Sequence, residues 1–413
     1  MSQSNQQLRI LAVRRESNEA TTSIVGTVQR SQETIEIYFR FPREYSDFLS
    51  ESADPFLAGL TVPAMHTGLA LASDVPVSPR LLRGLKRVQH VLAGWYPQDL
   101  REVSITGPVT TPTPLPRPAR AASFFSGGVD SFSTVLTHLY EPMPGEPPLT
   151  HLVFMHGLEV PLHQAIGADR SEAAVRGIAK ELGLECLVGE TNLRSFFNPS
   201  WGESWCGTGL AGTALSLAGG FTTFYIPSSG RVGQNLQWGS TALIDESCAT
   251  EALDIVNDGP LGRAEKIYRI ISRYDVALRN LRFCTSNMGG LGNCGKCRKC
   301  QRTMLQLEAA GVLDRVPFNS PPVIPPDFWR RNSSKNSNSV KMTLAVAQEA
   351  GAKPWLIAGL ERRIRRMERQ AGLRQLVHNS PLRHALPLYR TLRRTLLPRE
   401  WERKNGDSSG NSR

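Results

Sequence analysis

The chain has 413 residues, 40% hydrophobic and 21% charged, which suits one catalytic domain with one or two smaller additions. The first residues, MSQSNQQ, lack the apolar run of a signal peptide, and the seven cysteines then argue against a secreted, disulfide-stabilised protein. We therefore expect a cytoplasmic protein. The net charge of +11 is uneven, because residues 353–413 hold 15 basic and 5 acidic residues and the remainder is close to neutral.

The first hundred residues show the patterns of a small mixed domain. Alternating and β-branched residues predict strands over 8–15, 22–27, 34–40 and 101–105. Residues 79–92 predict an amphipathic helix, with apolar residues repeating on one face. We predict a small α+β domain over 1–106, in which no motif carries recognisable chemistry. A proline-rich linker over 107–120 follows it.

From residue 121 the pattern alternates between strand and helix. The predicted strands are 121–125, 152–155, 186–188, 222–226 and 281–284. The predicted helices are 131–140, 168–182, 210–218 and 264–272. Such alternation predicts an α/β fold, a doubly wound parallel sheet in a Rossmann-like α/β/α sandwich over 121–313. Ligands of such sheets bind beyond the carboxyl ends of the strands, beside the first strand.

One uncharged stretch, 205–230, is long enough to be weighed as a membrane span. The Gly219-Gly220 pair, Pro227 and the many small polar residues make it a poor one. We predict a buried helix followed by a buried strand, and no transmembrane segment.

The C-terminal part, 314–404, predicts a helical basic extension, and the last residues, 405–413, predict disorder. An apolar stripe lies opposite a group of arginines, with further leucines at 382–396; the stripe is Leu356, Leu360, Ile364 and Met367. The basic residues could contact RNA, an anionic membrane surface or a second subunit, as in a homodimer, or form a solvated helix face.

The hexapeptide at 126–131 follows a predicted buried strand and precedes a predicted helix. Its residues are Ser126, Gly127, Gly128, Val129, Asp130 and Ser131. Two glycines permit a sharp turn against an anion, and the helix start offers unpaired N–H groups. The serines add hydroxyl donors, and Asp130 could hold Mg²⁺ on bound phosphates. The alternative is an ordinary glycine turn with a serine cap.

A second motif is a group of four cysteines, the last three spaced as C-x-x-C-x-x-C. They are Cys284, Cys294, Cys297 and Cys300. Their number and spacing indicate a structural zinc site, for which neighbouring lysines and arginines would offset the thiolate charge. An iron–sulfur cluster would also take four thiolates, and buried unlinked cysteines are the third alternative.

The hexapeptide resembles the pyrophosphate loop of the N-type ATP pyrophosphatases (PP-loop enzymes), which have the adenine nucleotide alpha hydrolase type of fold. It departs from the Walker and G-x-G-x-x-G patterns, which disfavours γ-phosphate chemistry and a dinucleotide site. Loop and cysteine cluster together resemble the 7-cyano-7-deazaguanine synthase (QueC-like) family. The segments 262–267 and Gln301-Arg302-Thr303 extend this likeness over about 121–313.

The resemblance implies a ligase that activates a carboxylate with ATP, releases pyrophosphate and forms a C–N bond. In that family the acid is 7-carboxy-7-deazaguanine, ammonia forms the amide, a second ATP drives its dehydration to a nitrile, and zinc is structural. It implies that ATP and Mg²⁺ bind to the hexapeptide and Zn²⁺ binds to the cysteines. The candidate catalytic residues are Asp130, Ser131 and Lys266. His156, after the second strand, is a candidate for contacting the nucleotide.

Two segments depart from the family pattern. The usual Asp-Tyr-Gly-Gln run is replaced by 154–158, and a basic segment by 205–209. The nucleotide half of the site therefore looks retained and the acceptor half changed. Alternative hypotheses are a tRNA-modifying enzyme that installs sulfur or an amine, and a factor that conjugates a deazapurine-type group to a protein in defence or secondary metabolism. A non-enzymatic ATP-binding module is a further alternative.

Other polar residues have weaker signals. His163 lies near the expected nucleotide pocket, and Asp245 or Glu246 could accept a substrate amine or a metal. Cys206 and Cys248 could be nucleophiles of a thiolation enzyme, although small buried cysteines are commoner.

Overall fold

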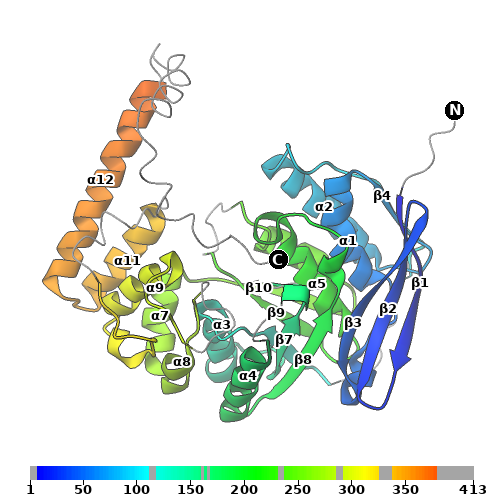
Figure 1. Ribbon diagram of the computed structural model, residues 1–413, viewed down its shortest axis with the longest axis horizontal. Coiled ribbons are helices and arrows are strands. Elements are labelled where there is room, and N and C mark those ends of the chain that lie inside the picture. The colour runs from blue at the N-terminus through cyan, green and yellow to red at the C-terminus, as the bar shows by residue number, and fades with distance from the viewer. Residues whose placement is uncertain are drawn as a thin grey trace, which may run out of the picture.

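A ten-stranded sheet with helices on both faces forms the centre of the computed structural model (Figure 1). The structure describes residues 7–110, 118–159, 162–164, 168–230, 237–284, 292–324 and 337–378. The strand order is β10-β9-β6-β7-β8-β3-β2-β1-β4-β5. Most neighbouring strands are parallel, which confirms the predicted α/β class and a Rossmann-like arrangement.

Five parallel strands form one half of the sheet. They are β6 (Ala121–Phe124), β7 (Leu149–His156), β8 (Glu185–Thr191), β9 (Thr223–Pro227) and β10 (Asp254–Asp258). The chain runs outward from β6 through β7 to β8, then returns to the other side of β6 with β9 and β10. The point where the order reverses lies between β6 and β9, and ligands bind at such points in open α/β sheets.

Alternate residues of these strands face two cores. Ala122 and Phe124 point to the core shared by α1 (Asp54–Thr67), α2 (Pro79–Trp95) and α5 (Cys206–Ser216). Ala121 and Phe125 point to the opposite core. That core includes residues of α3 (Val129–Tyr140), α4 (Ala168–Leu182), α7 (Arg263–Arg269), α8 (Asp275–Asn280) and α9 (Arg298–Ala309).

The N-terminal strands continue the same sheet. They are β1 (Gln7–Ser17), β2 (Thr21–Arg30), β3 (Glu33–Pro42), β4 (Ala70–Ser73) and β5 (Ile105–Thr106). The junction is an antiparallel pairing of β3 with β8, in which Phe39 faces Thr191 and Arg40 faces Glu190. The indole nitrogen of Trp205 also donates to the carbonyl of Gly59 on α1, at 2.8 Å. The predicted domain boundaries stay predictions, but the two regions share one sheet and one core.

Two predicted strands are wrong. Residues 281–284 have no regular structure, and of 101–105 only the last residue lies in a strand. The fifth parallel strand is β10. The sequence pattern does not indicate a strand there, because only Ile255 and Val256 are apolar in it. Helix α1 was also missed: Pro63 lies inside it and normally argues against a helix, yet nearly every α1 residue is buried.

The remaining helices are short or C-terminal. The short ones are η1 (Arg43–Phe48), η2 (Leu162–Gln164), η3 (Leu193–Ser195), the π-helix η4 (Trp201–Trp205), α6 (Ala242–Asp245), η5 (Glu246–Cys248), η6 (Ile271–Arg273) and η7 (Leu313–Arg315). Helices α11 (Ser337–Glu349) and α12 (Pro354–His378) follow at the margin of the molecule (Figure 1). Among the described helices none combines the length and apolar character that a membrane crossing needs. The predicted stripe at 382–396 and the tail 405–413 lie outside the described residues.

Candidate functional site

The diglycine turn lies between β6 and α3, beyond the carboxyl end of the first parallel strand. Gly127 has a φ of +73°, a backbone conformation that favours glycine. Gly128 is the N-cap residue of α3. The Ser131 hydroxyl accepts from the Gly128 N–H at 3.0 Å and donates to the Gly128 carbonyl at 3.1 Å, so it braces the turn from inside. The first N–H groups of α3 have no intrahelical partner and point outward at this end.

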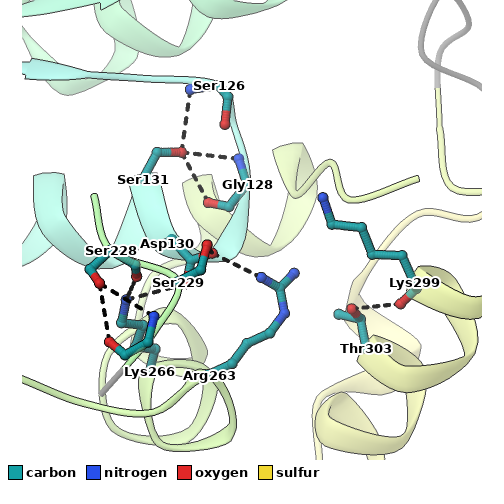
Figure 2. A network of polar contacts seen from close by, with 11 residues as sticks. Ser126, Gly128, Asp130, Ser131, Ser228, Ser229, Arg263, Lys266, Lys299 and Thr303 are labelled. Atoms are coloured by element: carbon teal, nitrogen blue, oxygen red, sulfur yellow. Dashed lines mark hydrogen bonds and ion pairs between the residues drawn. The ribbon is translucent and has the colours of Figure 1, made fainter. Parts of the chain in front are cut away.

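Asp130 is held by two cations from α7. Its carboxylate accepts from Arg263 Nη1 at 3.0 Å and from Lys266 Nζ at 3.2 Å (Figure 2). The Ser229 hydroxyl, which follows β9, approaches it at 3.4 Å. Burial opposes the charged form of Asp130. The positive charges of Arg263 and, to a smaller extent, Lys266 have a larger effect, and they hold the pKa of Asp130 below its usual value. Asp130 is therefore a carboxylate whose oxygens are already occupied by protein donors.

Lys266 is a buried residue, because its side chain is only 2% exposed. Its ammonium also donates to the Ser228 carbonyl, which follows β9. The neighbouring Glu265 accepts from the Gly262 N–H at 2.8 Å and thereby caps α7. Glu265 thus caps the helix, and the buried Lys266 connects the segments that follow β6 and β9.

Three further cations surround the turn. Arg282 donates its backbone N–H to the Gly127 carbonyl at 2.8 Å, and its side chain lies beside the Gly127 α-carbon. Lys299 extends from α9 toward the turn (Figure 2), and Arg302 lies one helical turn further along. Burial lowers the pKa of Lys299, and the Arg263 charge lowers it further. The same two causes lower the pKa of Arg302.

Some of these cationic groups have donors without acceptors. Within the described part of the chain, the Nε and Nη2 atoms of Arg263 and the Nη1 atom of Arg282 are buried and have no hydrogen-bond partner. Buried polar atoms are normally paired, so these guanidinium donors are available to an acceptor that enters the site. An anion beside the turn would satisfy them and would offset the excess of positive charge.

The four cysteines come together in space as the sequence predicted. Their sulfur atoms all lie within 4.8 Å of one another. The Cys284–Cys297 sulfur separation is 4.0 Å and the Cys294–Cys300 separation is 3.8 Å. A tetrahedral ion with metal–sulfur bonds of about 2.3 Å places its ligands about 3.8 Å apart. The cluster could therefore hold a metal ion such as zinc.

Backbone N–H groups hold two of the four sulfur atoms in place. Those of Lys296 and Cys297 donate to the Cys294 sulfur, each at 3.4 Å. The Cys300 N–H donates to the Cys297 sulfur, which caps α9. Burial opposes the Cys294 thiolate, but these donors outweigh it and lower the pKa of that thiol. The metal-binding residues therefore fix the start of α9, the helix that carries Lys299.

His156 lies at the end of β7, on the same edge of the sheet as the turn. Its Nε2 atom is 3.2 Å from a carboxylate oxygen of Glu172 on α4. A role in nucleotide contact stays a prediction. His163 lies in η2 and is exposed.

Of the remaining candidates, Glu246 is exposed, whereas Asp245, Cys206 and Cys248 are inside the protein. Asp245 is fully buried and accepts from the Ser240 hydroxyl at 2.7 Å and from the Asn257 amide at 2.6 Å. Burial raises the pKa of Asp245 to about 7. Burial also raises the pKa of the Cys206 and Cys248 thiols far above the usual value. Asp245, Cys206 and Cys248 are therefore not placed to meet a substrate from solvent.

Sequence reasoning missed three members of the cationic group. Arg282 precedes the cysteine motif, Lys299 lies within it and Arg302 follows it, so their positions in the sequence point first to the thiolates. The available signal was the number of basic residues in and around the cysteine motif.

Comparison with known proteins adds no family assignment, because no family model, curated protein or solved structure matches the chain.

The metal site generates one prediction. Purified protein should carry about one zinc ion per chain, measured by elemental analysis, and Cys297→Ser should lose most of it and melt at a lower temperature. Cys186→Ser, a thiol outside the cluster, is the matched control and should keep the metal. Protein that folds without metal, or that shows the visible absorption of an iron–sulfur cluster, would contradict zinc.

The buried Asp245 generates a pH prediction. A carboxyl whose pKa is raised on folding stabilises the folded state below its unfolded pKa, and this contribution is lost as pH rises toward 7. Asp245→Asn keeps the acceptor oxygen and removes the charge. Its stability relative to the parent should therefore rise between about pH 4 and 7, by about 1.4 kcal/mol per unit of pKa difference. Urea unfolding across this range measures it; a difference that does not change with pH would refute it.

Proposed function

We propose that the protein is an ATP-dependent ligase of the PP-loop, AMP-forming kind, similar to the QueC-like enzymes. In the proposed reaction a substrate carboxylate attacks the α-phosphorus of ATP and pyrophosphate leaves. Ammonia or an amine then attacks the resulting acyl adenylate, a C–N bond forms and AMP leaves. The acid we favour is a deazapurine or related heterocycle, because the sequence likeness is to enzymes of that chemistry.

The observation that carries the proposal is the set of buried, unpaired guanidinium donors beside the diglycine turn. Arg263 and Arg282 have donor atoms that need an anion, and Lys299 is partly buried among like charges. A leaving pyrophosphate is a compact, highly charged anion of the kind that such donors stabilise. The N–H groups at the start of α3 add to the same site.

The residues of the turn have distinct roles in this proposal. Gly127 and Gly128 let the backbone approach the phosphates, and Ser131 keeps the turn in shape. Asp130 fixes Arg263 and Lys266 against the turn. Mg²⁺ bound with the nucleotide would help to neutralise the charge of the leaving group, and Asp130 could bind it only by giving up one of the donors that now occupy its carboxylate.

The second substrate, which attacks the adenylate, is better described as a nitrogen nucleophile than as a sulfur donor. The thiolation alternative requires a reactive cysteine, and low-pKa, accessible thiols are the reactive ones. Cys206 and Cys248 are buried and their pKa values are raised. Four of the remaining cysteines belong to the metal cluster.

The test is product analysis with a matched pair of variants. Incubated with ATP, Mg²⁺, ammonia and a panel of heterocyclic carboxylic acids, the protein should form AMP and pyrophosphate in equal amounts, measured by chromatography. Lys299→Met should slow this about 100-fold, because it removes a cation that faces the leaving group. Lys296→Met changes an exposed lysine three residues earlier and should have little effect.

Production of ADP and phosphate would contradict the proposal, because it places bond cleavage at the γ-phosphate. Equal rates for the two lysine variants would contradict the role given to Lys299.

A further inference from the structure

Helix α12 is firmly attached to the body by one face. Leu356, Leu360 and Ile364 are buried in a small core, with exposed fractions of 0%, 0% and 9%. The partners in that core come from α7, α9 and α11: Ala264, Leu305, Ala309, Val340, Val346 and Ala347. An ion pair between Lys341 and Glu368 at 2.8 Å joins α11 to α12. The same α7 that carries Lys266 thus supports α12.

The opposite face of α12 is a row of arginines. At 3.6 residues per turn, Arg362, Arg366 and Arg369 fall within about 60° of one another around the axis. Leu360 and Ile364 lie on the other side of the helix. The three arginines are exposed, and none has an ion-pair partner among the described residues. Arg365, beside them, is 3.6 Å from Glu361.

This arginine row fits a chain of phosphates. It extends over about 10 Å of helix, enough to contact successive phosphates of a nucleic-acid strand. Guanidinium groups bind phosphate oxygens in pairs, and arginine, not lysine, supplies the row. No aromatic side chain lies between Arg362 and Arg369, so the row itself contacts the backbone; the exposed Trp355 lies two turns earlier, on the same side of the helix.

A membrane surface fits the same helix less well. Amphipathic helices bind membranes by inserting their apolar face, and the apolar face of α12 is already buried against the protein. Figure 1 shows α12 at the margin of the molecule, away from the N-terminal strands, where a long polyanion could lie alongside it.

We propose that the arginine row of α12 is a nucleic-acid-binding surface that contacts the phosphate backbone without sequence preference. This inference is independent of the adenylation chemistry. It gives the basic C-terminal region a partner, and it places that partner on a helix that shares a small core with α7.

The test is binding of the full-length protein to a fluorescent RNA duplex of about 20 base pairs, followed by anisotropy over a range of salt concentrations. The variant replaces Arg362, Arg366 and Arg369 with glutamine. Its affinity should fall about tenfold or more, and the slope of log affinity against log salt should decrease by about 2 to 3. The matched control replaces Arg83, Lys86 and Arg87 on α2, which are also exposed, and should bind like the parent.

Circular dichroism of both variants establishes that they are folded. If the α12 and α2 variants bind RNA equally, the arginine row is not the binding surface. If the parent binds vesicles containing phosphatidylserine but not RNA, the partner is a membrane and the proposal is wrong.

Discussion

The ion pairs between Asp130 and the two cations of α7 are the interaction on which the candidate site depends. Two segments that lie more than 130 residues apart meet here, at 3.0 Å and 3.2 Å, across the reversal point of the sheet. Removing one partner from such a buried arrangement leaves an uncompensated charge, at a typical cost of about 3–5 kcal/mol. The carboxylate is also outnumbered by the surrounding cations. Among the described residues the site therefore carries more basic than acidic side chains, an arrangement that favours an anion.

The metal cluster and the anion site are connected through α9. Cys297 caps that helix and Cys300 lies in its first turn, so a metal bound there would fix the direction in which Lys299 extends. On the other side of the turn, α7 supplies Arg263 and Lys266 and also supports α11 and α12. The cysteine cluster, the cationic group and the basic helix α12 are thus arranged around two adjacent helices, α7 and α9.

The parts of this arrangement that are local in sequence were predictable. The diglycine turn could be recognised because strand, turn and helix follow one another within about twenty residues. The cysteine cluster could be recognised because its spacing is typical of a tetrahedral metal site. The α/β class followed from the alternation of patterns. The cationic group was harder to predict, because Arg282, Lys299 and Arg302 reach the turn only through tertiary folding. The pairing of β3 with β8, which continues the sheet into the N-terminal strands, was also not predictable from the sequence, since only two residue pairs join these strands. Strand β10 has too few apolar residues to be read as a buried strand.

The most direct test of the central claim is a crystal structure with Mg²⁺ and an ATP analogue that cannot be cleaved between the α and β phosphates. The account predicts that the β and γ phosphates contact the N–H groups at the start of α3 and satisfy the unpaired donors of Arg263 and Arg282. Phosphates bound at another edge of the sheet, with these donors still unpaired, would contradict it.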